Sequence, residues 1–233
     1  MVQGWPLGSI RQRAVDIVRE QVLIDPLGLP GLFDLVAPAK GLVVFAHGSG
    51  SDPLSRRNLV DANYLADVLR QHRLSTLMFD LLTPTEATDR RKVFDIELLA
   101  SRVGQAIEWA GLQPAVGRSC LGLFGVSTGA AAALCAAAAR PNQVVAVVSR
   151  GGRPDLVTAD LQAVQAPTLL VVGTHDPQVL QLNRQAMRLL RCEKRLEVVP
   201  GATHLFEEPG AIDTVADLSG AWFANHFSTA WRS

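Results

Sequence analysis

Residues 120–134 read CLGLFGVSTGAAAAL, which is an apolar run, a short turn and an alanine-rich run in succession. The apolar run is typical of a buried strand, and the alanine-rich run predicts a helix over Thr128–Arg140. Between the two runs, Gly125 and Gly129 enclose Ser127 in a Gly-x-Ser-x-Gly pattern. A serine on a tight strand-to-helix turn has strained backbone angles, and glycines beside it remove side chains that would collide there. The stretch therefore predicts a serine displayed on a sharp turn.

Apolar runs alternate with amphipathic stretches on both sides of this turn. The run Gly41–Ala46 (GLVVFA) is apolar throughout, as expected of a strand buried on both faces. Two earlier runs, 21–24 and 32–36, are separated by a Pro/Gly turn and predict a hairpin. Further strands are predicted at 75–81, 120–124, 144–148, 168–172 and 195–199, and further helices at 63–72, 96–110, 178–190 and 211–227. This alternation predicts an α/β fold with a mostly parallel central sheet, helices on both of its faces and no large lid.

The composition favours one globular domain. The 233 residues include 22 basic and 22 acidic side chains, so the formal net charge is zero. Hydrophobic residues make up 48 % and charged residues 19 %, which is enough apolar material for a sizeable core. We therefore expect a single domain over residues 1–233, in which residues 1–20 form a peripheral segment. A zero charge balance gives no reason to expect a nucleic-acid partner, because such proteins present a basic face.

The cysteines do not suggest a metal site, and the sequence contains no run that predicts a membrane-spanning segment or a signal peptide. The three cysteines are Cys120, Cys135 and Cys192, and they show no Cys-x-x-Cys or Cys/His ligand spacing. We expect no disulfide framework, no metal and no cofactor. The longest strongly apolar run, Ala130–Ala139, is far shorter than the roughly 20 residues of a membrane span, and the N-terminus lacks an apolar signal region. We expect a cytoplasmic protein; the sequence does not indicate its oligomeric state.

A serine nucleophile needs a base, and the base needs an orienting carboxylate. Of the histidines that follow Ser127, His204 lies in a loop after a predicted strand, whereas His226 lies inside a predicted helix and suits packing or the surface. Asp176 follows another predicted strand, and His175 adjoins it on a turn too tight for the two side chains to meet. Ser127, His204 and Asp176 are therefore the candidate nucleophile, base and acid.

Each of these residues has a structural alternative. Ser127 could serve only as a helix N-cap, Asp176 with Pro177 could merely begin the next helix, and His204 could be an ordinary loop histidine. Asp80 ends an earlier strand and is an alternative acid, but it precedes the serine and suits a turn better. Three required residue types, each after a different predicted strand, favour the catalytic interpretation.

The loop after the strand 41–46 reads HGSGSD. An acyl-transfer site needs backbone N–H donors for the oxyanion of its tetrahedral intermediate. We assign these donors to Thr128, directly after the nucleophile, and to Ser49 in this loop, with His47 and Gly48 as possible substrate contacts. A Gly/Ser loop by itself is often only a turn. The loop does not match a phosphate-binding motif.

Two arginines follow the predicted strand 144–148, at the edge of the sheet where Ser127 is expected. Arg150 and Arg153 are candidates to bind a substrate carboxylate or phosphate in bidentate fashion. The alternative is that they pair with nearby acids such as Asp155 and shape the loop.

Taken together, these motifs resemble the α/β-hydrolase superfamily and, within it, the dienelactone-hydrolase-like branch. The order Ser127, Asp176, His204 is the order of that fold. The resemblance extends from about residue 20 to the end of the chain, and the segments that carry it are GLVVFAHGSGSD (41–52), TLMFDLLTP (76–84), GLFGVSTGAAAAL (122–134), SRGGRPDL (149–156), LLVVGTHD (169–176) and PGATHLFEEPGA (200–211). The namesake dienelactone hydrolases use a cysteine nucleophile, and Ser127 stands at that position here.

The resemblance implies a serine hydrolase acting on a small-molecule carboxylic ester, thioester or lactone, with water as the second substrate. An acyltransferase with the same three residues is the first alternative, and a non-catalytic hydrolase-like binding protein is the second. Similar sequences also occur joined to a phosphoribosyltransferase domain, for which we expect no room in 233 residues.

Overall fold

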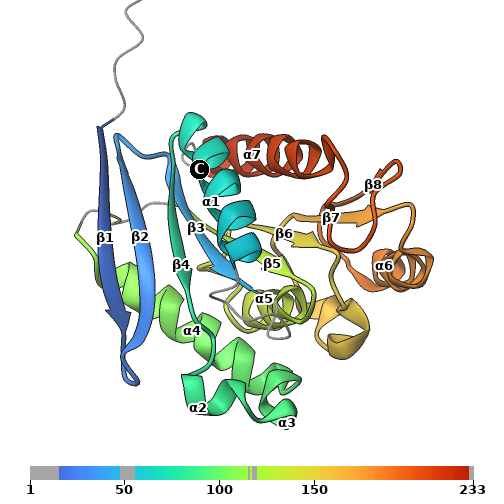
Figure 1. Ribbon diagram of the computed structural model, residues 1–233, viewed down its shortest axis with the longest axis horizontal. Helices are drawn as coiled ribbons and strands as arrows, with labels where there is room; N and C mark the ends of the chain where they lie inside the picture. Colours follow the sequence, from blue (N-terminus) through green and yellow to red (C-terminus); the bar gives the residue numbers. More distant parts are fainter. Residues whose placement is uncertain (1–15, 48–55, 115, 117–119, 231–233) are drawn as a thin grey trace, which may run out of the picture.

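A computed structural model describes residues 16–47, 56–114, 116 and 120–230. Within this part, eight strands form one sheet in the order β1-β2-β4-β3-β5-β6-β7-β8 (Figure 1). Strand β2 runs antiparallel to both of its neighbours, β1 and β4, whereas every other neighbouring pair is parallel. The strands are β1 (Asp16–Ile24), β2 (Leu29–Ala37), β3 (Gly41–Ala46), β4 (Leu74–Phe79), β5 (Cys120–Val126), β6 (Ala146–Arg150), β7 (Thr168–Gly173) and β8 (Lys194–Val199).

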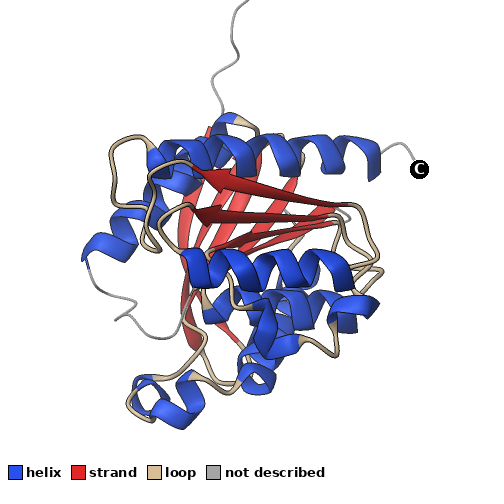
Figure 2. Ribbon diagram, turned by 90° about the vertical axis from the view of Figure 1, so that its right-hand side faces the viewer, coloured by secondary structure: helices blue, strands red, loops and turns tan. Residues whose placement is uncertain are grey.

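Helices cover both faces of the sheet, as Figures 1 and 2 show. Helices α1 and α7 lie side by side on one face, and α4, α5 and α6 lie on the other. The helices are α1 (Arg56–Gln71), α2 (Pro84–Ala87), α3 (Arg90–Val93), α4 (Ile96–Leu112), α5 (Thr128–Ala139), α6 (Pro177–Leu189) and α7 (Ala211–Ala230), with 3₁₀ turns η1 (Pro154–Val157) and η2 (Leu161–Ala163). The α/β architecture expected from the sequence is confirmed.

The central strand β3 shows why its sequence is apolar without interruption. Successive side chains of a strand point to opposite faces. Val43 and Phe45 accordingly pack in the cluster beneath α1 and α7, whereas Leu42 and Val44 pack in the cluster beneath α4 and α5. Both faces are covered, so every residue of this strand is buried.

Helix α7 packs closely against the middle of the sheet because two strand positions lack side chains. A Cβ atom at Gly122 would lie 2.5 Å from the Phe223 ring, and one at Gly41 would lie within 2.5 Å of the Phe227 ring. Both phenylalanines are buried, at 0 % and 1 % exposure. The glycines thus make room for two aromatic rings of α7 directly over β3 and β5.

The predicted hairpin of the first two strands is confirmed, and a buried carboxylate ties it to the rest of the domain. Asp34 in β2 is fully buried and accepts two hydrogen bonds from Arg19 of β1, at 2.7 and 2.8 Å. It also pairs with Arg70 of α1. A buried charge is tolerated when it is paired in this way.

Several element boundaries differ from the prediction, and two of these differences lie at strongly charged positions. Helix α1 begins at Arg56 rather than at residue 63, since its first three residues, RRN, are polar and do not mark a helix start in the sequence. Strand β6 ends at Arg150 rather than at residue 148, because Arg150 pairs in register with β5 and β7 despite its charge. The short helices α2 and α3 were not predicted.

No helix within the described residues combines the length and apolarity that crossing a membrane requires.

Replacing Phe227 by alanine should lower the free energy of unfolding by about 3–5 kcal/mol, because it opens a cavity against β3. Phe94→Ala is the matched control, since Phe94 is 48 % exposed and the same substitution there should cost less than about 1 kcal/mol. Urea denaturation followed by circular dichroism measures both values. Equal losses in the two variants would contradict the packing described for α7.

Candidate active site

Ser127 occupies the turn between β5 and α5, with φ 53° and ψ −118°. Such angles are costly for a residue with a side chain. The two flanking glycines are required for close packing: a Cβ at Gly129 would lie 2.1 Å from the Ala46 carbonyl oxygen, and one at Gly125 would lie 2.4 Å from the Ala130 Cα. The sequence-based reason for these glycines is therefore confirmed, and the turn displays Ser127 at the carboxyl end of β5.

The Ser127 side chain does not cap helix α5, although the residue stands at the N-cap position. The interpretation of this serine as a simple capping residue is therefore wrong. The first backbone N–H groups of a helix have no acceptor within the helix, and the helix dipole adds positive potential at this end. Thr128, the first residue of α5, is buried there. The Ser127 hydroxyl thus lies where negative charge is stabilised.

Asp176 and His204 form a hydrogen bond between two different loops. The Asp176 Oδ2 atom lies 2.6 Å from the His204 Nδ1 atom. Because an ionised carboxylate can only accept, Nδ1 carries the proton and Nε2 keeps a lone pair. The other carboxylate oxygen accepts from the Val179 backbone N–H at 3.4 Å, so Asp176 also begins helix α6. The helix-start alternative for Asp176 is correct but incomplete, because the same side chain also bonds the imidazole.

Backbone contacts hold these two loops together. Gly173, the last residue of β7, would place a Cβ 2.1 Å from the Ala202 carbonyl oxygen, so the two chain segments touch. The His175 backbone N–H donates to the same Ala202 oxygen at 2.9 Å, and Thr174 Oγ1 accepts from the Gly201 N–H at 2.7 Å. The segment that carries His204 is thereby fixed beside the end of β7.

The end of β6 and the loop after it contact both the Ser127 turn and His204. The Ser127 backbone N–H donates to the Arg150 carbonyl at 3.1 Å, and the Arg153 N–H donates to the Ser127 carbonyl at 3.2 Å. Gly151 has φ +53°, and a Cβ there would lie 3.3 Å from His204 Cε1. Ser127 and His204 are thus brought to one edge of the sheet, against the same loop.

The predicted oxyanion loop is described only in part. Ser49 and Gly48 lie outside the described residues. His47 follows β3, and its ring centroid lies 5.9 Å from that of Phe45. Burial and, as the smaller cause, the positive charge of Arg150 together lower the pKa of His47 to about 4. His47 is therefore neutral near pH 7.

The two candidate arginines have different partners. Arg153 forms two hydrogen bonds with Asp155, at 2.8 and 2.7 Å, as the alternative interpretation predicted. Arg150 instead donates from Nη2 to the Leu205 carbonyl oxygen at 2.5 Å, and its guanidinium lies 5.0 Å from the centroid of the Phe206 ring. Sequence reasoning missed the roles of Leu205 and Phe206, since nothing in the pattern marks their contacts with an arginine 55 and 56 positions earlier.

The remaining candidates lie elsewhere. His226 is buried in α7 with its ring centroid 4.4 Å from that of Trp222, which agrees with the packing role expected for it. The His175 side chain is exposed. Asp80 follows β4, which β3 separates from β5, the strand that precedes Ser127. The contacts described above do not place the side chains of His226, His175 or Asp80 beside Ser127, Asp176 and His204.

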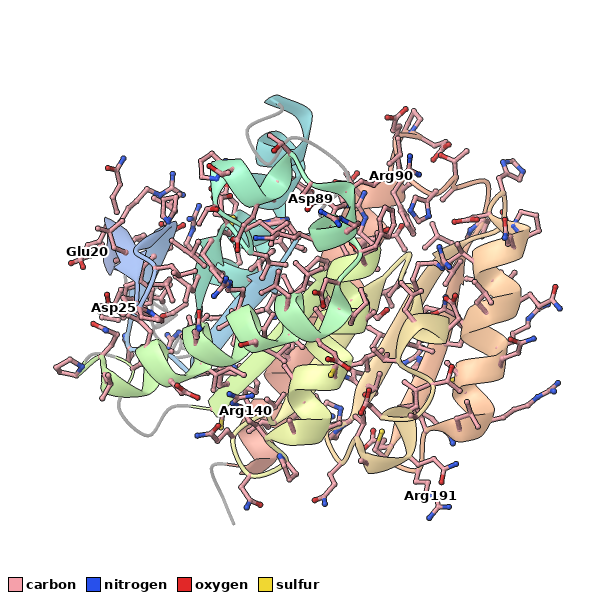
Figure 3. All side chains as sticks on the ribbon, turned by 90° about the horizontal axis from the view of Figure 1, so that it is seen from below. Glu20, Asp25, Asp89, Arg90, Arg140 and Arg191 are labelled. Atoms are coloured by element: carbon pink, nitrogen blue, oxygen red, sulfur yellow. The ribbon has the colours of Figure 1, made fainter. Side chains whose placement is uncertain are left out.

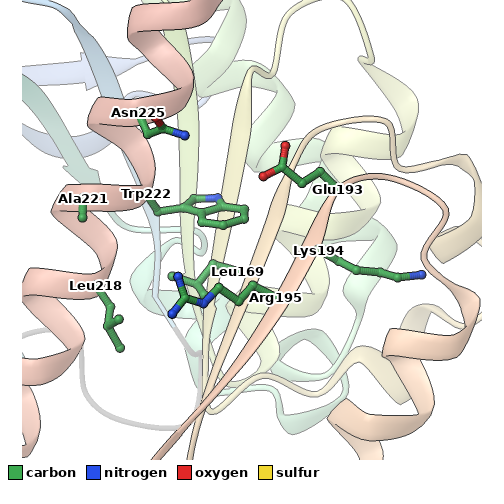
Figure 4. A pocket seen from close by; sticks show the side chains of 8 residues that line it. All are labelled: Leu169, Glu193, Lys194, Arg195, Leu218, Ala221, Trp222 and Asn225. Atoms are coloured by element: carbon green, nitrogen blue, oxygen red, sulfur yellow. The ribbon is translucent and has the colours of Figure 1, made fainter.

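A pocket of about 380 Å³ lies away from this group (Figure 4). It opens between α7 and the starts of β7 and β8, around Trp222, at the opposite end of these strands from Asp176 and His204. Within the described residues, no three His, Cys, Asp or Glu side chains gather as a metal site would need.

Curated proteins and solved structures that are similar to this chain include the following. Two curated proteins of Mycobacterium tuberculosis, from strains CDC 1551 and H37Rv, are each called a putative phosphoribosyl transferase and are 50 % identical over 206 residues. These residues make up 88 % of this chain and 46 % of the relatives, so the chain spans about half of their length. The crystal structure of a dienelactone hydrolase from Anabaena variabilis is 46 % identical, with a TM-score of 0.83, and the alignment covers 91 % of this chain and 98 % of that one.

A more distant structure, Est1E from Butyrivibrio proteoclasticus, shares the fold at 14 % identity, with a TM-score of 0.73 over 90 % of this chain and 99 % of that one. The model of the dienelactone hydrolase family matches residues 62–226, which include Ser127, Asp176 and His204. With that match and the 46 % identity to a dienelactone hydrolase that the alignment covers to 98 %, this α/β hydrolase belongs to the dienelactone hydrolase family.

Proposed function

We propose that this hydrolase is a serine esterase that cleaves a carboxylic ester, thioester or lactone of a small molecule. The observation that carries the proposal is the 2.6 Å contact between Asp176 and His204, next to a loop that also bonds the backbone of Ser127. The strained turn at Ser127 supports the same conclusion, because a strained backbone at a site edge is a feature of nucleophile turns.

In the first half of the reaction, Ser127 Oγ attacks the carbonyl carbon while its proton passes to His204 Nε2. Asp176 keeps the proton on Nδ1 and stabilises the imidazolium that forms. The oxyanion accepts hydrogen bonds from the backbone N–H groups of Thr128 and, as predicted from the sequence, of Ser49. The bond to the leaving oxygen or sulfur then breaks, and this atom takes the proton from His204. The acyl group remains on Ser127.

In the second half, water attacks the acyl-enzyme carbonyl while His204 Nε2 takes its proton. The bond to Ser127 Oγ breaks, the serine regains its proton from His204, and the carboxylic acid leaves. The exposed fraction of the His204 side chain, 39 %, supports access of water to this base. No metal or redox cofactor takes part in this sequence of steps.

Phosphoribosyl transfer is not proposed for this chain. The mycobacterial relatives that carry that name are about twice as long, whereas the family matched over residues 62–226 is one of hydrolases. An acyltransferase differs from the proposed esterase only in the second half, where an alcohol or amine would replace water. A non-catalytic binding protein would lack an activated serine.

The central test uses a fluorophosphonate probe and a short p-nitrophenyl ester. Wild-type protein should be labelled at Ser127 and should hydrolyse the ester, whereas Ser127→Ala should lose labelling and at least about 10³-fold in kcat. Absence of labelling in the folded wild-type protein would favour the binding protein. Product esters or amides formed in preference to the free acid, with alcohols or amines added, would favour the acyltransferase.

Asp176→Asn should separate the two roles of this carboxylate. The amide oxygen can still accept from the Val179 N–H, so the melting temperature should change little. The imidazole would adopt the wrong tautomer, and kcat should fall by about 10³–10⁴-fold. Ester hydrolysis and thermal unfolding of the same sample measure both effects. Retained activity would contradict the role given to Asp176.

Ser127→Gly should be more stable than Ser127→Ala by about 1 kcal/mol or more, because glycine tolerates a positive φ that alanine does not. Both variants lack the hydroxyl, so neither should hydrolyse esters, and the difference between their unfolding free energies isolates the backbone strain. Equal stability of the two variants would show that the turn is unstrained.

A further inference from the structure

We infer that Arg150 is a positioning residue that holds the His204 loop in place for catalysis, rather than a receptor for a substrate anion. This role rests on the proposed function, since it assumes that His204 is the base. The inference comes from where the Arg150 backbone and side chain make their contacts.

The Arg150 backbone lies between the nucleophile strand and the strand that precedes the acid. Arg150 pairs in register with Val126 of β5 and with Val171 of β7. Its carbonyl accepts the Ser127 backbone N–H at 3.1 Å. Since β6 is central in the sheet and all its strand neighbours here are parallel, this backbone is a fixed point next to Ser127.

The Arg150 side chain reaches from this fixed point to the residues that directly follow His204. Its Nη2 donates to the Leu205 carbonyl at 2.5 Å, and its guanidinium lies over the Phe206 ring at 5.0 Å from the centroid. A guanidinium over an aromatic face and a charge-assisted hydrogen bond are both favourable contacts. One side chain thus fixes two consecutive residues of the loop.

The loop needs such support because of its own conformation. Phe206 has φ 56°, which is unfavourable for a residue with a bulky side chain, and it is only 2 % exposed. A strained residue persists when its surroundings hold it. The His204 ring also meets Gly151, whose absent Cβ would lie 3.3 Å from Cε1. The imidazole therefore contacts the loop after β6 and belongs to the segment that Arg150 anchors.

The contrast with Arg153 supports a positioning role over anion binding. The Arg153 guanidinium is occupied by the carboxylate of Asp155, which neutralises it. Arg150 directs a guanidinium nitrogen at a backbone carbonyl and its guanidinium face at an aromatic ring. Both of these partners are groups of the protein itself. Its charge also contributes to the lowered pKa of His47, which places that charge near the end of β3.

Arg150→Met removes the guanidinium and keeps an apolar stem of similar length. We expect kcat for a neutral p-nitrophenyl ester to fall by about 10- to 100-fold, with KM changed by less than about threefold, because a misplacement of about 1 Å costs such a factor. A carboxylate-bearing ester should lose the same factor. Arg191→Met is the matched control, since Arg191 points outward (Figure 3) and bonds Gln162 on the surface. Its kinetics should equal those of the wild type.

A loss confined to the anionic ester and expressed as a raised KM would make Arg150 an anion receptor and overturn the inference. Wild-type kinetics in Arg150→Met would overturn it as well. Arg150→Lys keeps a charge and a donor but no planar group over Phe206, so it should restore part of kcat. If circular dichroism shows that Arg150→Met is unfolded, Arg150→Lys must itself show a loss in kcat with both esters, and otherwise the inference fails.

The His204 ring gives a readout that needs no turnover. The Nδ1 proton shared with Asp176 should resonate far downfield in proton NMR of the wild type and of Arg191→Met, and should shift or broaden in the folded Arg150 variant. An unchanged resonance would overturn the positioning role even if esters are hydrolysed. Failure of the wild type to react with the fluorophosphonate would overturn the proposed function and with it the catalytic purpose of Arg150. A displaced resonance would then still show that Arg150 positions the His204 loop, so the two failures are distinguishable.

Discussion

The close approach of helix α5 to the end of strand β3 is the contact on which the candidate site depends. At Gly129 the backbone comes so near the Ala46 carbonyl that no side chain fits between them. This contact fixes where α5 starts, and the start of α5 sets the angles of Ser127. Since parallel strands end at the same edge of the sheet, the loops after β6, β7 and β8 then converge on the serine. The site is in this sense a consequence of how closely one helix can pack against one strand.

The loop after β6 connects this turn to the other members of the group. It bonds the Ser127 backbone on one side and contacts His204 on the other. Asp176 is fixed independently, because it stands at the start of α6 and its loop is bonded to the residues after β8. Three loops thus determine the geometry, and each is anchored by backbone hydrogen bonds rather than by side chains alone. Backbone anchoring of this kind pre-organises a site before substrate arrives.

Much of the fold could be predicted because its signals are local. GLVVFA gave the bounds of β3 without error, since both faces of that strand are covered and no polar residue interrupts the pattern. The placement of Ser127, Asp176 and His204 at the ends of different strands could also be predicted, because each follows an apolar run.

The end of β6 was misjudged, because Arg150 is a charged residue held in a strand by its neighbours. The hydrogen bond from Arg150 to the Leu205 carbonyl could not be predicted, because no sequence pattern indicates which backbone carbonyl 55 residues away will accept from an arginine. The positive φ of Phe206 could not be predicted either, since phenylalanine does not favour that conformation.

The double use of Asp176 constrains how this protein can change over generations. One oxygen accepts a hydrogen bond at the start of helix α6 and the other bonds His204, so the effect of a replacement depends on which of the two interactions it keeps. Asparagine keeps the first interaction and loses the orienting charge, whereas alanine loses both. A descendant that abandoned hydrolysis while keeping the fold would therefore tolerate asparagine at position 176 more readily than alanine. Asparagine there, beside an intact Ser127 and His204, would mark a relative that keeps the start of α6 but has lost the carboxylate that orients the imidazole.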